Sequence, residues 1–147
     1  VIKEDAMTNL GGLIHKVAHK MKREIDHANQ KLGVSGVQGR IIGYVRCESK
    51  NRDVFQKDIE EHFELRGSSV TSTLQNLEKM GFIVRESIPT DQRLKRIVLT
   101  KKALDIHNQI TKNIEQVEKE AFSSINKEEE QLLSDLLKRI LNNIEKY

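Results

Sequence analysis

Apolar residues recur at three- and four-residue steps near the start of the chain, in a stripe formed by Leu10, Leu13, Ile14, Val17, Met21, Ile25 and Ala28. This period predicts a long helix over residues 5–31. Gly33 interrupts the pattern. Ser35 is followed three residues later by a glutamine, the pair typical of a capping box, which predicts a second helix over residues 35–48. The residues that this second helix directs inward are Val37, Ile41, Tyr44 and Val45.

Two shorter helices joined by a tight turn are predicted in the middle of the chain. Asp53 is placed to cap the first of them, over residues 54–63. The second covers residues 67–80 and ends at Gly81, because glycine adopts a left-handed backbone at little cost. Two short helices connected in this way are typical of a helix-turn-helix.

The period changes after the fourth helix in a way that predicts a β-hairpin. Residues 82–87 are strand-like, residues 89–92 supply turn residues, and apolar and polar positions alternate again over residues 94–100. Both faces of the second strand are mixed, so the period alone leaves open which face is buried. A hairpin directly behind a helix-turn-helix suggests a wing.

Two amphipathic helices are predicted at the end of the chain, over residues 101–124 and 127–146. Asn126, followed three residues later by a glutamate, caps the second of them. Paired leucines widen the apolar face of the last helix, which consists of Leu132, Leu133, Leu136, Leu137, Ile140, Leu141 and Ile144. Together with helix 5–31, these helices carry more apolar surface than one small winged lobe can cover, which favours a homodimer.

Composition favours a mainly helical protein, and charge is unevenly distributed along the chain. The chain has 147 residues, one proline and no tryptophan, and its net charge is only +3. The distribution of charge says more than the net value. Residues 53–65 have a net charge of −4, with five acidic and one basic side chain, whereas residues 92–102 have five basic side chains and no acid. A basic segment of this kind is typical of nucleic-acid-binding surfaces.

Several other classes of protein are disfavoured. Cys47 is the sole cysteine, so an internal disulfide and a zinc site of several thiolates are excluded. No apolar run approaches the roughly 20 residues of a membrane span, and the start lacks the apolar core of a signal peptide, so we expect a cytoplasmic protein. No catalytic or phosphate-binding motif is found, so neither an enzyme nor a cofactor is expected. His15 and His19 have metal-ligand spacing but lie opposite the apolar stripe, so no metal is expected either.

The fourth predicted helix has one apolar and one polar face. At 100° per residue, Leu74 and Leu77 both fall within about 40° of Val70. The polar side consists of Ser68, Ser69, Thr71, Ser72, Gln75, Asn76 and Lys79. Small hydroxyl residues and amides without a central acid suit a helix in the major groove of DNA, where they bind base edges and phosphates. A solvated polar face is the alternative reading.

The predicted hairpin tip carries Asp91, Arg93, Lys95 and Arg96. An arginine at such a tip can enter a narrow minor groove, where the potential is most negative. Asp91 could orient the Arg93 guanidinium through a charge-assisted hydrogen bond. An ordinary charged turn is the alternative reading.

Three segments together resemble the MarR family (multiple antibiotic resistance regulators). Residues 91–100, Asp-Gln-Arg-Leu-Lys-Arg-Ile-Val-Leu-Thr, resemble the wing signature of that family. Residues 70–83 resemble its recognition helix and the exit from it, and residues 56–59 resemble the start of the preceding helix. The order of elements is similar over nearly the whole chain.

The resemblance implies a mainly α-helical winged helix-turn-helix protein with a small β-hairpin wing and long terminal dimerisation helices. Residues 1–31 and 101–147 would form the dimerisation region, and residues 32–100 the DNA-binding lobe. The implied function is that of a sequence-specific double-stranded DNA-binding regulator, a homodimer on a pseudo-palindromic operator. The implied mode is repression relieved by a small aromatic or anionic effector.

The resemblance also suggests an effector site, and some alternatives remain open. The effector site would involve Ile14, Val17, Met21, Arg40, Ile41, Tyr44 and His107, although plain core packing explains these positions as well. Cys47 could serve thiol-redox sensing, but a lone cysteine is more often a small buried hydrophobe. The remaining alternative is a winged-helix module that binds protein rather than DNA.

Overall fold

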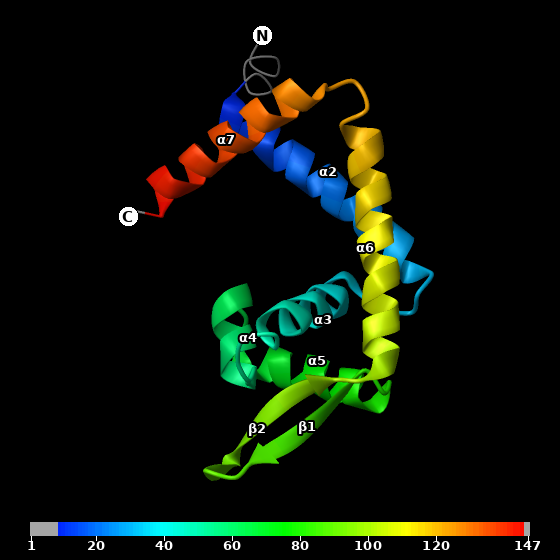
Figure 1. Ribbon diagram of the computed structural model, residues 1–147, viewed down its shortest axis with the longest axis vertical. Coiled ribbons are helices and arrows are strands. Elements are labelled where there is room, and N and C mark those ends of the chain that lie inside the picture. The colour runs from blue at the N-terminus through cyan, green and yellow to red at the C-terminus, as the bar shows by residue number, and fades with distance from the viewer. Residues whose placement is uncertain (1–8, 146–147) are drawn as a thin grey trace. The chain divides into compact units, whose positions relative to one another are not determined.

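The computed structural model describes residues 9–145 and contains six helices and one β-hairpin within them (Figure 1). The elements are α2 (Leu10–Gln30), α3 (Gly36–Glu48), α4 (Gln56–Phe63), α5 (Gly67–Lys79), β1 (Ile83–Ile88), β2 (Asp91–Leu99), α6 (Lys101–Ala121) and α7 (Lys127–Ile144). The predicted class, mainly helical with a small hairpin wing behind a helix-turn-helix, is confirmed. The predicted helix positions 5–8 and 146 lie outside the described residues.

Two of the predicted helix caps are confirmed. The Ser35 hydroxyl accepts from the Gln38 backbone N–H at 3.1 Å, and the Gln38 side chain accepts from the Ser35 N–H at 3.0 Å. Asn126 and Glu129 form the same reciprocal pair before α7. Each pair satisfies two backbone donors that the first helical turn leaves free, which sets where α3 and α7 begin.

The predicted cap of α4 is wrong. α4 begins at Gln56, after Phe55, and not after Asp53. The cause is the preceding residue, because Val54 is buried and its carbonyl accepts from the Ile97 N–H at 2.8 Å. The chain is therefore held extended beside β2 at this point. The Asp58 carboxylate, three residues into the helix, accepts from the Phe55 N–H at 2.8 Å and supplies the missing cap.

The inward face of α3 is also displaced from the prediction. Ile41 and Val45 are fully buried as predicted, but so is Ile42, whereas Val37 is 37% exposed. At 100° per residue, the buried stripe is centred between Ile41 and Ile42. Val37 therefore lies at the margin of this stripe.

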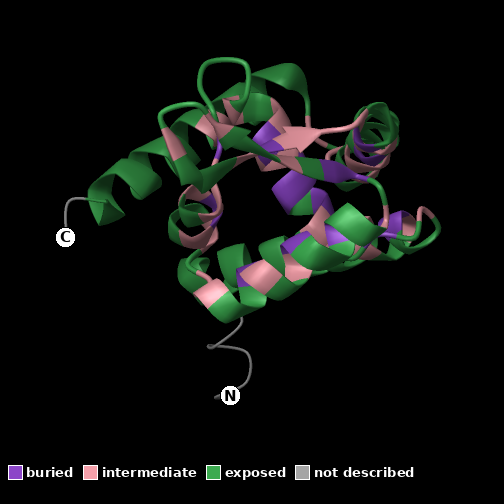
Figure 2. Cartoon of the chain, turned by 90° about the horizontal axis from the view of Figure 1, so that it is seen from below, coloured by how far each residue is buried: buried purple, intermediate pink, exposed green. Residues whose placement is uncertain are grey.

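Contacts divide the chain into two compact units. One unit is Lys22–Ile114, and the other combines the residues up to Met21 with those from Glu115 onward. The first unit contains the hydrophobic core, coloured as buried in Figure 2. Its fully buried large side chains are Ile41, Ile42, Ile59, Leu74, Leu77, Ile83, Val45, Val54 and Val70.

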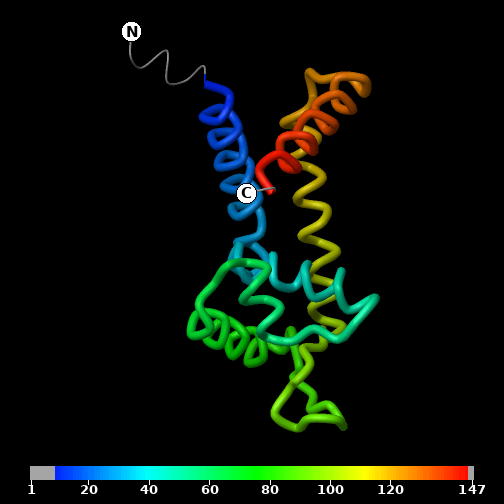
Figure 3. The backbone as a smooth tube through the Cα atoms, turned by 90° about the vertical axis from the view of Figure 1, so that its left-hand side faces the viewer, coloured from blue at the N-terminus to red at the C-terminus, as the bar shows by residue number. Residues whose placement is uncertain are grey.

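The hairpin is an antiparallel pair that projects beyond α3, α4 and α5 (Figures 1 and 3). Ile83 pairs with Leu99 and Arg85 pairs with Ile97. Ile83 and Ile97 are buried, whereas Val84 is 44% exposed. The apolar period did not decide which face of the hairpin is buried. The structure shows that it is the face of Ile83 and Ile97, which packs on the core.

Several polar contacts tie α6 to the rest of the Lys22–Ile114 unit, and two of them involve Asn113 and His107. The side-chain oxygen of buried Asn29 accepts from the Asn113 amide at 3.0 Å. Arg46 Nη1 lies 2.8 Å from Nδ1 of His107. A guanidinium can only donate, so Nδ1 accepts and the neutral ring carries its proton on Nε2. Burial first, and then the positive charges of Arg46 and Lys50, lower the pKa of His107 below its ordinary value of 6.5.

We predict that Leu74→Ala lowers the free energy of unfolding by about 2–5 kcal/mol, because it removes a fully buried side chain from the core. Urea denaturation followed by circular dichroism measures the change. Leu94→Ala is the matched control, since Leu94 is 46% exposed and its truncation leaves no cavity. Equal losses in the two variants would contradict this assignment of the core.

We predict that His107 makes the fold less stable as the pH falls below about 6.5. The folded state resists protonation of the ring because its pKa is lowered, whereas the unfolded chain takes up the proton, so acid favours unfolding. His107→Asn retains an acceptor near Nδ1 but does not titrate. Its free energy of unfolding should fall less steeply than that of the wild type from about pH 7 to about pH 5. Parallel pH profiles would show that His107 does not resist protonation.

Candidate nucleic-acid interface

Helix α5 is fixed in orientation by its apolar face. Val70, Leu74 and Leu77 are each 0% exposed, as the period predicts. Gly81 follows Met80, the C-cap of the helix, and its φ of 79° lies in the left-handed region that ends a helix. The packing of the apolar face therefore directs the opposite face outward.

The outward face of α5 consists of small and amide side chains. The exposed members are Ser68, Ser69, Ser72, Gln75, Asn76 and Lys79. Glu78, on the flank of this face, is paired with Arg85 of β1 at 2.7 Å. The one acid of α5 is thus neutralised by the hairpin, which leaves the outward face without an unpaired negative charge.

Thr71 differs from the other predicted members, because it is half-buried and bonded to α4. Gln56, the first residue of α4, donates from Nε2 to Thr71 Oγ1 at 2.8 Å and to the Gly67 carbonyl at 3.4 Å. The family resemblance places Gln56 only at the start of a helix and does not predict this bond. The apolar period carries no signal for this bond, because Gln56 and Thr71 lie in different helices.

The hairpin tip presents Arg93 to solvent. Its side chain is 95% exposed, and its Nε lies 3.6 Å from Asp91 Oδ1. The same carboxylate oxygen accepts from the Arg93 backbone N–H at 2.9 Å. Asp91 therefore holds the backbone of the turn firmly and the guanidinium loosely, so that the guanidinium remains free to bind elsewhere.

Arg96 does not lie at the tip, contrary to the prediction. It pairs with Glu86 on the adjacent strand at 2.9 Å and lies 3.7 Å from Asp53. It thereby joins the hairpin to the loop before α4. Lys95, opposite Ser87 in the hairpin register, is exposed.

The candidate effector residues have several different surroundings. Ile41 is fully buried in the core. Arg40 lies 3.4 Å from Asp26, and the Tyr44 hydroxyl accepts from Arg52 at 3.2 Å. Burial raises the pKa of Tyr44; the charge of Arg52 opposes this shift, and the charges of Glu48 and Asp58 add to it. The remaining candidates, Ile14, Val17 and Met21, belong to the other unit, where the first two are exposed and Met21 is half-buried.

Tyr44 belongs to an aromatic cluster between α3 and α4. Its ring stacks on that of His62 with 4.3 Å between centroids and meets Phe63 edge-on. Arg52 lies 3.1 Å from both Glu48 and Asp58, and these bonds raise the pKa of its guanidinium. The cluster fixes the first helix of the helix-turn-helix against α3.

Cys47 is exposed, so its expected place as a small buried hydrophobe is wrong. His15 and His19 lie with their rings stacked at 6.2 Å. Within residues 9–145, no group of three histidine, cysteine or acidic side chains is arranged to hold a metal ion. No helix in this range is long and apolar enough to cross a membrane.

Residues 32–94 match the sequence model of the MarR family. The chain is 30% identical to the HTH-type transcriptional regulator YdgJ of Bacillus subtilis over 92 residues, which are 63% of this chain and 56% of YdgJ.

Solved structures extend the similarity to nearly the whole chain. The transcription regulator MarR from Oenococcus oeni is 31% identical, with 91% of this chain and 99% of that chain covered, at a TM-score of 0.67. MepR of Staphylococcus aureus, in a crystal structure with DNA, is 24% identical, with 92% and 96% covered, at a TM-score of 0.76. Three findings agree: the fold contains a helix-turn-helix with a wing, the family model matches, and the similarity to MarR extends over the full length of that protein. The chain belongs to the MarR family of winged-helix transcription regulators.

Proposed function

We propose that this protein is a sequence-specific regulator that binds double-stranded DNA as a homodimer and represses transcription until a small effector releases it. The observation that carries the proposal is the two-faced helix α5, packed on the core through Val70, Leu74 and Leu77 and polar on its outward side. The fold shared with MepR, which has been crystallised with DNA, supports the proposal.

In the proposed complex, α5 lies in the major groove. Its exposed serines allow the helix to approach the base edges closely. Gln75 and Asn76 suit adenine, whose edge offers one donor and one acceptor, and Lys79 suits a phosphate or guanine. An exposed face aimed at a protein would tolerate unpaired acids, whereas Glu78 is neutralised by Arg85. The charge on this side therefore favours DNA over a protein partner.

The wing is proposed to bind the minor groove through Arg93. The guanidinium is almost fully exposed, and Asp91 fixes the turn that carries it. Lys95 lies in the same strand and is free to contact a phosphate, whereas Arg96 binds Glu86 and Asp53. We therefore assign Arg96 to the placement of the wing on the lobe and Arg93 to DNA.

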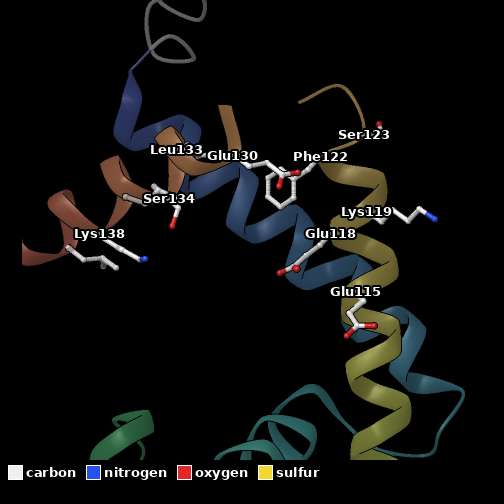
Figure 4. Close-up of a pocket in the computed structure, with 11 residues that line it drawn as sticks. Glu115, Glu118, Lys119, Phe122, Ser123, Glu130, Leu133, Ser134 and Lys138 are labelled. Carbon is white, nitrogen blue, oxygen red and sulfur yellow. The ribbon is translucent and has the colours of Figure 1, made fainter. Parts of the chain in front are cut away.

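We propose that a second copy of the chain packs on the apolar face of α7. Its seven leucine and isoleucine side chains, from Leu132 to Ile144, are all between 37% and 62% exposed. A groove of about 700 Å³ beside them, between α6 and α7, is lined in part by Phe122, Leu133 and Leu137 (Figure 4). Fully burying an exposed side chain of this kind contributes on the order of 1.5–3 kcal/mol, and covering these partly buried ones contributes a fraction of that each. We accordingly propose residues 1–31 and 101–147 as the dimerisation region and residues 32–100 as the DNA-binding lobe.

The effector is proposed to be a small aromatic or anionic molecule. Within the Lys22–Ile114 unit, Tyr44 and His107 are candidate residues that combine a polar group with partial exposure. The buried position of Ile41 favours a packing role for that residue.

Arg93→Ala should weaken binding to a duplex selected from a random pool by about 1–3 kcal/mol, because it removes the exposed cation of the wing. Fluorescence anisotropy titration measures the dissociation constant. Arg23→Ala removes an equal charge from an exposed position of α2 and is the matched control. Affinity that falls equally in both variants would indicate a general charge effect and would count against the wing.

Leu136→Glu should convert the dimer to monomer, because it places a charge in the apolar face of α7. Sedimentation equilibrium measures the mass, and the variant should also lose affinity for a two-half-site duplex. Asn142→Asp adds the same charge on the polar side of α7 and should remain dimeric. A wild-type protein that is monomeric at micromolar concentration would refute the proposed dimer.

A further inference from the structure

The amide of Gln56 connects the two helices of the helix-turn-helix at the edge of the α5 outward face. Its Nε2 donates to the Thr71 hydroxyl oxygen at 2.8 Å and to the Gly67 carbonyl at 3.4 Å. Both bonds are partly buried, and they reach from the first residue of α4 to the first two turns of α5. Gln56 is therefore well placed to control what Thr71 presents to a ligand.

The direction of these bonds follows from their partners. A carbonyl oxygen can only accept, so the group of Gln56 that faces Gly67 is the NH₂ and not the oxygen. The same NH₂ faces Thr71, whose hydroxyl oxygen must then accept. The hydroxyl proton of Thr71 is left to point elsewhere.

Thr73 provides a contrast on the same helix. Its hydroxyl donates to the Ser69 carbonyl, four residues earlier, at 2.9 Å. The equivalent carbonyl for Thr71 is that of Gly67, which already receives the helical N–H and the Gln56 amide. No hydrogen bond donated by the Thr71 hydroxyl is found within residues 9–145. The proton of Thr73 is thus used inside the helix, and that of Thr71 is not.

Thr71 also lies next to the outward face. At 100° per residue it is within about 60° of Ser68 and Gln75, whereas Thr73 is on the opposite flank. A donated hydrogen bond from Thr71 can therefore reach the partner of that face.

We infer that Gln56 is a positioning residue that makes Thr71 a hydrogen-bond donor to DNA, so that α5 selects an acceptor atom at this point. This inference rests on the proposed function. The acceptor is either an atom on a base edge, such as N7 or O6 of guanine or O4 of thymine, or a phosphate oxygen. The N–H₂ donors of adenine and cytosine are disfavoured at the same position, because Gln56 already occupies one of the two lone pairs of the hydroxyl oxygen and a donor there would leave the Thr71 proton without an acceptor.

The test compares wild type, Gln56→Met, Thr71→Val, the double variant and Thr71→Ser on duplexes selected from a random pool. Dissociation constants are measured on the preferred duplex and on all single-base changes of one half-site. For a base acceptor, Gln56→Met and Thr71→Val should each reduce the preference at the same base pair by about two- to tenfold, the range of one hydrogen bond. For a phosphate acceptor, both should weaken all duplexes equally, and a methylphosphonate at one linkage should reproduce the loss.

For either acceptor, the double variant should lose no more affinity or base preference than Thr71→Val alone, since Gln56 acts through Thr71. Thr71→Ser should behave as wild type, and Thr73→Val, the matched control, should leave the preference unchanged. Thermal unfolding checks each variant. If Gln56→Met lowers stability, Gln56→Glu replaces it, because its carboxylate accepts the Thr71 proton and should abolish the same preference.

The inference would be overturned if the losses of affinity or preference in the single variants add in the double variant. It would also be overturned if Thr73→Val has the same effect as Thr71→Val. In both cases, binding by the wild type would still uphold the proposed function. A wild-type protein that retains no duplex from the pool would overturn both.

Discussion

The burial of one face of α5 is the constraint on which the rest of this structure depends. Val70, Leu74 and Leu77 are removed from water completely, and the burial of each contributes on the order of 1.5–3 kcal/mol. This packing fixes the rotation of the helix about its own axis. The serines and amides on the other side are then directed outward, so a rigid core determines what the surface can recognise.

Electrostatic pairing around this helix separates supporting charges from available ones. Arg85 neutralises Glu78, and Arg96 binds Glu86 and Asp53. These exposed pairs contribute little to stability, but they determine which cations remain free. Arg93, at the end of the hairpin, is almost fully exposed. The basic segment seen in the sequence therefore divides into a part that holds the wing and a part that is available to a polyanion.

The sequence predicted the elements whose cause is local. Capping boxes at Ser35 and Asn126 and the three-residue apolar face of α5 depend on neighbours a few positions away, and all are confirmed. The errors arose where distant residues decide. Val54 is held beside β2 by Ile97, which delays the start of α4 beyond the cap expected at Asp53. The partners of Arg96 and the bond between Gln56 and Thr71 likewise join segments that a period cannot relate.

The most direct test of the central claim is the salt dependence of wild-type binding to a selected duplex. If the α5 face and the wing together contact six or more phosphates, the logarithm of the affinity should fall linearly with the logarithm of the salt concentration. The loss should be on the order of 10³-fold or more between about 50 and about 200 mM salt. Affinity that stays constant over this range, or that is absent at the lowest salt, would contradict the claim that this surface binds DNA.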